Sequence, residues 1–246
     1  MSEIQKIAVV IDADNTQLSK ISDVLRELST HGRIVVKRAY GNWRKDALRN
    51  WESEIKDLAI KAEQQFDYVS GKNATDMALV IDTLELLHSK LYDAFAIVSS
   101  DSDYTPLAIK LRESGVYVFG VGTMSTPESF RNSCDEFLFL ENISSVAEPV
   151  PAQSAEQHKA VKKDSMDVIH GLLRTAYETY QDNDGYANAS LAGDFIKRTK
   201  SDFDCRTYGF TKMSQLLEAF PQKYKVERIA GKNNTVVLYK CLSDHR

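Results

Sequence analysis

The stretch IAVVIDADN at residues 7–15 decides the fold of the first half of the chain. Its five leading apolar residues indicate a strand buried on both faces, as in a parallel sheet. Strand and helix patterns alternate after it. We expect strands at 34–40, 66–69, 94–99, 116–121 and 137–140, and helices at 18–29, 46–64, 75–90 and 105–115. This alternation predicts an α/β domain with a central parallel sheet and flanking helices on both faces.

A change in composition separates this half from the rest of the chain. Residues 144–163 hold two of the five prolines and few bulky apolar residues, so we expect a linker there. Helices are then expected at 167–180, 188–199 and 211–220, and strands at 224–229 and 235–240 around a turn at 231–234. The pattern predicts one domain at 1–143 and a small α+β winged helix-turn-helix domain at 164–246.

Charge and cysteine content exclude some classes of protein. The 246 residues carry 31 Lys and Arg against 35 Asp and Glu, which excludes a uniformly basic coat protein for nucleic acid. The charge is uneven, with a net −6 over 1–145 and +1 over 164–246. Three distant cysteines without a CxxC pair indicate neither a zinc knuckle nor a disulfide framework. Without a signal peptide or a membrane-spanning apolar run, we expect a cytoplasmic protein with no membrane partner.

Acidic residues gather where the expected strands end. Asp12 and Asp14 directly follow the first strand, Asp101 and Asp103 follow a later one, and Asp76 lies in the first turn of a helix. Open α/β sheets bind ligands at this edge, so Asp12 and Asp101 converge if their strands are neighbours. Clustered carboxylates need positive compensation, which Mg²⁺ or Mn²⁺ supplies because it prefers oxygen ligands. Such an ion can promote hydrolysis of a phosphodiester.

Each of these positions also has a purely structural interpretation. Asp103 could cap the helix that follows it, and the helix dipole alone favours an acid at Asp76. Asn15 could orient water or phosphate, or it could cap a helix. Ser100 could donate to phosphate or satisfy backbone groups at the strand end. Asp82 lies about 240° around the helix from Asp76, so it could support the site only from another face.

Four stretches of the first domain resemble consecutive motifs of the NYN domain. Three match its acidic motifs and one its end: VVIDADN (9–15), GKNATDMALVIDTL (71–84), IVSSDSDYTPLAIKLRESG (97–115) and VFGVGTMSTPESFRNSCDEFLFLE (118–141). The resemblance covers residues 3–143 and is closest to the LabA-like bacterial branch, within the PIN-like nuclease superfamily. The sequence departs from the family at 73–75, Asn-Ala-Thr, where members often have glycine and valine.

This resemblance implies a metal-dependent ribonuclease with a PIN-like fold. Its catalytic and metal-binding residues would be Asp12, Asp76, Asp101 and Asp103, with Mg²⁺ or Mn²⁺ as the cofactor. Supporting positions would be Asn15 and Asp82. From the residues themselves, Ser100 is a further supporting candidate and Asn15 a candidate RNA contact. Lys72 could contact phosphate, or it could be an ordinary solvated lysine of its loop.

Residues 184–228 resemble an OST-HTH/LOTUS domain, a winged-helix-like module associated with RNA. The match centres on Phe203-Asp204, Arg206, Tyr208-Gly209-Phe210 and Lys212-Met213, and extends over about 164–242. Independently, residues 197–232 hold nine Lys and Arg against four acids. This excess predicts a surface that binds RNA, although a solvated charged surface over core aromatics is the alternative. The candidate RNA-binding residues here are Lys197, Arg198, Arg206 and Lys212.

Three classes of function remain open from the sequence. The first is a ribonuclease with an RNA-binding module, and RNA is then the expected partner. The second is a non-catalytic RNA-binding or regulatory adaptor that retains the PIN-like fold. The third is a phosphatase or small-nucleotide hydrolase, which would use similar carboxylates. A second copy of the chain and an RNA-processing protein are further candidate partners.

Overall fold

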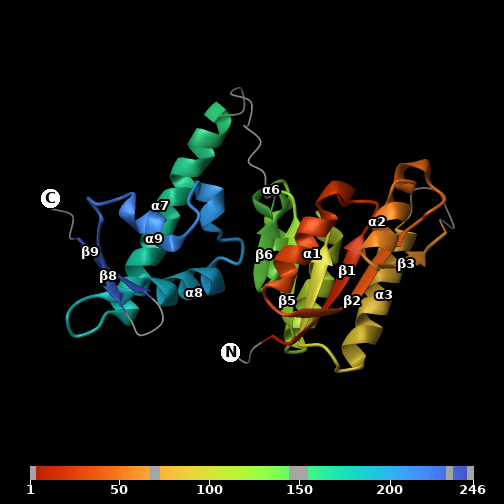
Figure 1. The fold of residues 1–246 in the computed structure, drawn as a ribbon, viewed down its shortest axis with the longest axis horizontal. Helices are drawn as coiled ribbons and strands as arrows, with labels where there is room; N and C mark the ends of the chain where they lie inside the picture. The colour runs from red at the N-terminus through yellow and green to blue at the C-terminus, as the bar shows by residue number, and fades with distance from the viewer. Residues whose placement is uncertain (1–3, 67–72, 144–154, 231–234, 243–246) are drawn as a thin grey trace. The chain divides into compact units, whose positions relative to one another are not determined.

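The computed structural model describes residues 4–66, 73–143, 155–230 and 235–242. The chain divides into two compact units, Met1–Val146 and Ala147–Arg246 (Figure 1). Each has its own hydrophobic core. No helix in these ranges is long and apolar enough to cross a bilayer.

The first unit is built on a six-stranded parallel sheet. The strand order is β3-β2-β1-β4-β5-β6, so β1 lies between β2 and β4. The strands are β1 (Lys6–Asp12), β2 (Arg33–Gly41), β3 (Lys61–Gln64), β4 (Ala94–Val98), β5 (Tyr117–Gly122) and β6 (Glu136–Phe139). All residues of β1 except Lys6 are buried, as the apolar run predicts. This confirms the predicted parallel sheet.

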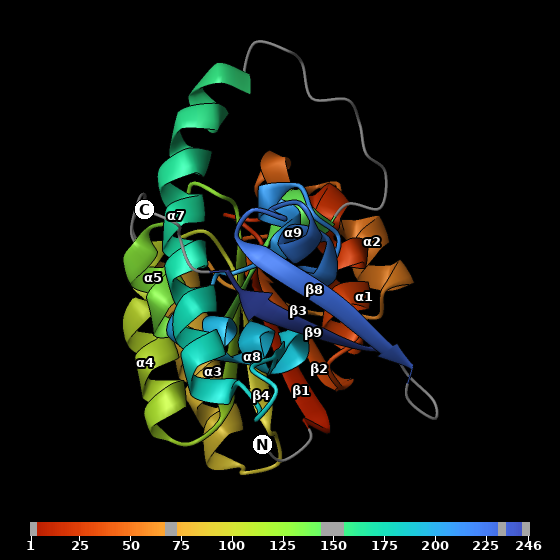
Figure 2. The ribbon, with the colours of Figure 1, turned by 90° about the vertical axis from the view of Figure 1, so that its left-hand side faces the viewer.

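Helices cover both faces of this sheet, and Figure 2 shows the two groups of helices on opposite sides of it. One face packs against α1 (Ile21–Ser29), α2 (Trp51–Asp57) and α6 (Leu140–Ile143). The other packs against α3 (Ala74–His88), α4 (Thr105–Glu113) and α5 (Glu128–Ser133). The chain moves outward from β1 to β3, returns through α3, and continues from β4 to β6. The carboxyl ends of β1 and β4 therefore lie side by side where the direction reverses.

One predicted helix is wrong. Residues 46–64 form a short 3₁₀ helix (Asp46–Leu48), then α2, and then strand β3. The helix stops because Ala59 adopts a positive φ of 48°, after which residues 61–64 pair with β2 at the edge of the sheet. Local composition favoured a helix, but strand pairing overrides it. The strand predicted at 66–69 falls largely outside the described residues.

The second unit is a small α+β fold. Its helices are α7 (Ala155–Tyr180), α8 (Ala189–Thr199) and α9 (Met213–Glu218), and its antiparallel sheet has the order β7-β9-β8. The strands are β7 (Ala187–Asn188), β8 (Tyr224–Ala230) and β9 (Thr235–Cys241). Apolar faces of all three helices pack with this sheet around Ile169, Ile196 and Leu216. The predicted three helices and hairpin strands are confirmed, while the turn at 231–234 lies outside the described residues.

The start of α7 differs from the prediction. The helix begins at Ala155, inside the stretch 144–163 that composition marks as a linker. Residues 155–170 contain neither proline nor glycine, whereas Pro149 and Pro151 precede the helix, so nothing local interrupts it. The domain boundaries at 143 and 164 stay predictions.

Candidate functional site

Asp12 ends the central strand β1 and has no exposed surface. Its Oδ2 accepts hydrogen bonds from Ser99 Oγ at 2.9 Å and Asn15 Nδ2 at 2.9 Å, and its Oδ1 accepts from Asn15 N at 3.3 Å. Burial raises the pKa of this carboxyl, and Asp76 raises it further, against the lowering effect of these hydrogen bonds. Asn15 therefore orients the carboxylate, and it is not the N-cap of the following 3₁₀ helix, which is Gln17.

The end of β4 is joined to Asp12 through Ser99. The same Ser99 Oγ that donates to Asp12 accepts from Asp101 N at 3.1 Å. Asp101 Oδ1 then accepts from Asp103 N at 2.9 Å and caps the 3₁₀ helix Ser102–Tyr104. The pairing of β1 with β4 thus brings Asp12 and Asp101 to one edge. The sequence predicted this convergence on the condition that the two strands are neighbours.

Asp76 reaches the same edge from the first turn of α3. Its Oδ1 accepts from Tyr104 Oη at 2.8 Å. Partial burial raises the pKa of Asp76, and the nearby charges of Asp101, Asp103 and Asp14 raise it further. The hydroxyl of buried Tyr104 counteracts this shift and fixes the carboxylate. Residues from three separate elements therefore share one electrostatic environment.

The remaining acids border this group. Asp14 Oδ1 lies 3.3 Å from Lys45 Nζ, and its Oδ2 accepts from Thr75 Oγ1 at 3.3 Å. Exposed Asp103 accepts from Asn73 Nδ2 at 3.2 Å. Asn73 and Thr75, where the sequence departs from the NYN pattern, therefore bind acids of this edge. These two hydrogen bonds join the start of α3 to the acidic edge.

The carboxylates suit a divalent cation by their chemistry. Among the described residues, no lysine or arginine pairs with Asp12, Asp76, Asp101 or Asp103, and the partners given above for these four are neutral. Mutual repulsion of this kind is relieved by a hard cation that prefers oxygen ligands. Within the same residues, no three acidic, histidine or cysteine side chains are arranged to hold a metal ion as they stand. By its chemistry, the set of oxygen donors therefore fits a divalent cation.

Two predicted supporting residues have other partners. Ser100 Oγ accepts from Thr123 N at 3.0 Å and lies 3.2 Å from Thr123 Oγ1, so it joins the ends of β4 and β5. Asp82 forms an ion pair with Arg38 and accepts from the hydroxyl of buried Tyr40. It therefore joins α3 to β2. Lys72 lies outside the described residues.

Four of the nine bases in the basic stretch 197–232 are paired with its own acids. Its four acids each pair with a base: Lys200–Asp202, Arg206–Asp204, Lys225–Glu227 and Arg228–Glu218. Of its aromatics, Tyr224 is buried, and Tyr208 and Phe210 pack against the core.

The candidate RNA contacts in this unit differ in their environment. Arg206 is bound to Asp204, and Arg198 donates to Tyr180 Oη at 3.0 Å. Lys197 is half-buried near the end of α8, and Lys212 is exposed at the N-cap of α9. Fewer basic side chains are therefore available to contact phosphate than the nine Lys and Arg counted in residues 197–232.

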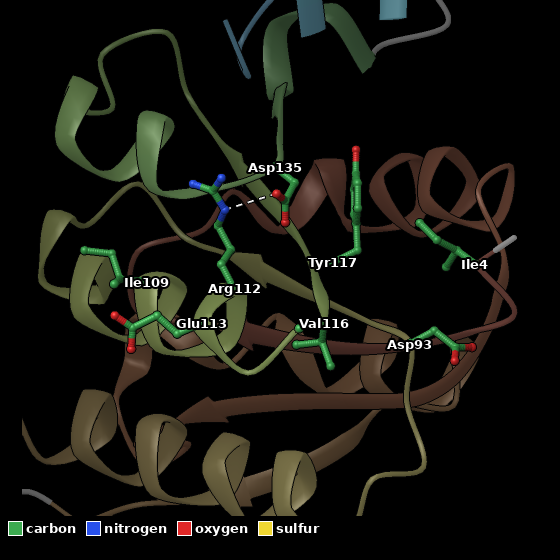
Figure 3. A pocket seen from close by; sticks show the side chains of 9 residues that line it. Ile4, Asp93, Ile109, Arg112, Glu113, Val116, Tyr117 and Asp135 are labelled. Carbon is green, nitrogen blue, oxygen red and sulfur yellow. Dashed lines mark hydrogen bonds and ion pairs between the residues drawn. The ribbon is translucent and has the colours of Figure 1, made fainter. Parts of the chain in front are cut away.

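A cavity of about 720 Å³ lies at the opposite edge of the sheet (Figure 3). Its lining includes Ile4 and Tyr117, which lie at the amino ends of β1 and β5. Its arginine, Arg112, is held by Asp135 with Nε 3.0 Å from Oδ1. Parallel strands place this cavity and the carboxylates at opposite ends, so it is not part of the acidic site.

Sequence reasoning missed Tyr104 and Lys45 as members of this edge. Tyr104 looks like an ordinary residue before a helix, and only the return of α3 places Asp76 beside its hydroxyl. The spacing between Lys45 and Asp14 gives no sign of contact, because it depends on the pairing of β1 with β2.

Comparisons with known proteins match both units. The family model of the NYN domain matches residues 6–141, and that of the OST-HTH/LOTUS domain matches residues 160–236. An uncharacterized protein of Methanocaldococcus jannaschii is 29% identical over 124 residues, which are 48% of this chain and 47% of the relative. The chain thus spans about half the length of this curated relative. Neither family match tests the LabA-like branch.

Two solved structures also match. A crystal structure of a protein of unknown function from Vibrio parahaemolyticus has a TM-score of 0.46 at 15% identity, over 56% of this chain and 94% of the other. A solution NMR structure of an uncharacterized protein from Nitrosomonas europaea has a TM-score of 0.28 at 22% identity, over 42% of this chain and 94% of the other.

Proposed function

Because the chain belongs to the NYN domain family and continues into an OST-HTH/LOTUS domain, we propose that it is a Mg²⁺- or Mn²⁺-dependent ribonuclease. NYN domains are PIN-like nucleases, and OST-HTH/LOTUS domains are associated with RNA. One observation carries the proposal. The fully buried carboxylate of Asp12 shares an edge with Asp76 and Asp101, and among the described residues no lysine or arginine forms an ion pair with any of these three.

The proposed ligands are Asp12, Asp76, Asp101 and Asp103. A bound divalent ion would activate water and stabilise the charge that develops on the scissile phosphate. Ser99 and Asn15 hold the Asp12 carboxylate in one orientation, while Tyr104 holds that of Asp76. These neutral donors leave the carboxylates their negative charge for the cation.

The second unit would hold the RNA. Exposed basic side chains such as Lys212 attract the phosphate backbone without regard to sequence. RNA retained there would reach the acidic edge at a higher local concentration.

Cleavage of a labelled RNA in Mn²⁺ tests the catalytic assignment. We expect Asp12→Asn and Asp101→Asn to reduce the cleavage rate by about 100-fold or more, because each removes a charge that faces the cation. Glu85→Gln is the matched control, since Glu85 is an exposed carboxylate on α3. Equal rates in all four proteins would refute the assignment.

The same assay separates the alternatives. RNA binding without cleavage under any divalent ion would favour the non-catalytic adaptor. Hydrolysis of nitrophenyl phosphate or mononucleotides, without cleavage of RNA, would favour a small-phosphate hydrolase. The M. jannaschii relative has no assigned activity in its name, so the proposal depends on the domain families and the acidic edge.

A further inference from the structure

A second cavity lies beside the acidic edge and plays no part in the proposed catalysis. Its volume is about 430 Å³, within the range of about 300–1,000 Å³ that is common for sites that bind small ligands. Apolar side chains line it, namely Leu48, Ile55 and Ala62, together with basic residues and Trp43. The segment that follows β2 and the first turns of α2 supply most of the lining.

Backbone and side-chain contacts connect this cavity to the carboxylates. Ala13, between Asp12 and Asp14, donates its N–H to Tyr40 O at 3.0 Å, so the ends of β1 and β2 are joined. Lys45 lines the cavity, and its Nζ lies 3.3 Å from Asp14 Oδ1. Lys45 therefore connects the lining of the cavity to the acidic edge.

The charge of the cavity is opposite to that of its domain. It is lined by four basic and two acidic residues, whereas residues 1–145 carry a net −6. Arg49 pairs with Asp46 and Lys56 with Glu52, so the pairs neutralise one another. Among the described residues, no carboxylate pairs with the exposed guanidinium of Arg44. An arginine of this kind suits a phosphate, which it can bind with two parallel hydrogen bonds.

Trp43 gives the cavity a fixed aromatic side. Its Nε1 donates to Glu63 O at 3.1 Å, and its ring centroid lies 5.9 Å from that of buried Trp51. Gly41 lies against the lining of the cavity, since a Cβ there would lie only 2.8 Å from Leu48 Cδ1. The indole is thus held in place, and stacking a base on it would cost little side-chain entropy.

We propose that this cavity binds one unpaired nucleotide of the RNA strand next to the cleaved phosphate. The base would lie against Trp43, and Arg44 and Lys45 would contact its phosphates. A base can enter only when it is unpaired, so the cavity would direct the enzyme to single-stranded segments. The positive residues would also offset the repulsion between the strand and the carboxylates. This inference rests on the proposed ribonuclease function.

Tryptophan emission tests the proposal in the full chain. Trp43 and Trp51 are the two tryptophans of the sequence, so their emission reports on this cavity and not on the second unit. We expect tetrauridylate, added in EDTA to prevent turnover, to quench the emission in a saturable manner. Arg44→Glu should weaken this binding by about 10-fold or more. Lys110→Glu, the same charge change at an exposed residue of α4, should change it less than about 2-fold.

The outcomes separate this inference from the nuclease assignment. Unchanged emission at concentrations where the anisotropy of a labelled tetrauridylate shows binding would overturn the cavity proposal. Equal weakening by Arg44→Glu and Lys110→Glu would also overturn it. RNA cleavage in Mn²⁺ without a tryptophan response would remove the cavity and keep the nuclease. A response that depends on Arg44, without cleavage, would support the nucleotide site and refute the nuclease.

Discussion

Asp12 combines complete burial with a negative charge, and this conflict defines the site at the level of single residues. Burial in the centre of the sheet raises the pKa of the carboxyl, and Asp76 adds to the shift. The raised pKa means that the folded state binds a proton more tightly than the unfolded chain. Stability is therefore highest below the ordinary carboxyl pKa and is lost as the pH rises through the raised value.

We predict that Asp12→Asn stabilises the first unit at neutral pH. The amide has no charge to bury, so the variant lacks the loss of stability described above. The sign of the change follows from the raised pKa of Asp12, because a group that binds a proton more tightly in the folded state loses stability as the pH rises. Urea unfolding at pH 4 and pH 7.5, followed by tryptophan emission, measures the change. The advantage of the variant should grow with pH, and an advantage that is equal at both values would contradict the argument.

A divalent ion should make the natural protein more stable than Asp12→Asn. Mn²⁺ that binds only the folded protein stabilises it, by about 2.7 kcal/mol at 100 times its dissociation constant. We expect Mn²⁺ to raise the melting temperature of the natural protein and to have little effect on Asp12→Asn. Glu85→Gln should respond as the natural protein does. A rise of the same size in Asp12→Asn would place the bound ion elsewhere.

Asp82 and Asp76 lie on the same helix, α3, but they have different partners. Asp82 receives the Arg38 guanidinium and the Tyr40 hydroxyl, and these contacts join α3 to β2. We predict that Asp82→Asn lowers the free energy of unfolding by about 1–3 kcal/mol, because it weakens a partly buried charged hydrogen bond. Urea unfolding measures this loss. Cleavage per folded molecule should fall less than 2-fold, and a larger fall would restore the supporting role that the sequence suggests.

At the level of elements, the site depends on how closely β4 and β5 approach. A Cβ at Gly122, in β5, would lie 2.8 Å from the backbone oxygen of Ser99 and 2.6 Å from Thr126 Oγ1. A Cβ at Gly120, two residues earlier, would instead meet Phe137 Cδ2 at 2.5 Å and Cys134 Sγ at 2.7 Å. Both glycines therefore permit tight packing, but only Gly122 lies against the residue that holds Asp12.

This difference makes a matched pair of variants. We predict that Gly122→Ala and Gly120→Ala each destabilise the first unit by about 1–3 kcal/mol through overpacking. Gly122→Ala should also lower cleavage per folded molecule by about 10-fold or more, because it displaces Ser99 from the Asp12 carboxylate. Thermal unfolding and Mn²⁺-dependent cleavage measure the two effects. Equal loss of cleavage in both variants would show that strand packing in general, and not Ser99, controls the site.

For the whole molecule, the net charge of −4 conceals two units of different character. The first carries the acidic excess, and the second carries a small basic excess, in which several of the bases are paired with acids of the same unit. RNA contact in the second unit should therefore depend on exposed bases that are not neutralised by a neighbouring acid.

Lys212 and Lys225 test this distinction. We predict that Lys212→Ala weakens binding of a labelled RNA in EDTA by about 3- to 10-fold and lowers the slope against salt by about 1. Lys225→Ala removes the same charge, but Lys225 Nζ lies 2.9 Å from a Glu227 oxygen, so its effect should be below 2-fold. Fluorescence anisotropy at several salt concentrations measures both. Equal effects would mean that net charge alone controls binding.

Local patterns determined much of this protein from sequence. The apolar run before Asp12 and the alternation of elements predicted a parallel sheet with acids at its carboxyl edge, because burial and period are properties of neighbouring residues. The motifs of the two families were recognisable for the same reason. The ends of α2 and α7 were not predicted, since strand pairing and an uninterrupted helical segment decided them.

Only the tertiary structure decided which of these residues meet. The neighbouring position of β1 and β4 joins Asp12 to Asp101 through Ser99, and the return of α3 brings Asp76 to Tyr104. The pairing of β1 with β2 places Lys45 against Asp14. These contacts join residues far apart in the chain, so they depend on strand order and on the face each helix covers. Sequence therefore determined the chemistry available at the edge, and the fold determined its arrangement.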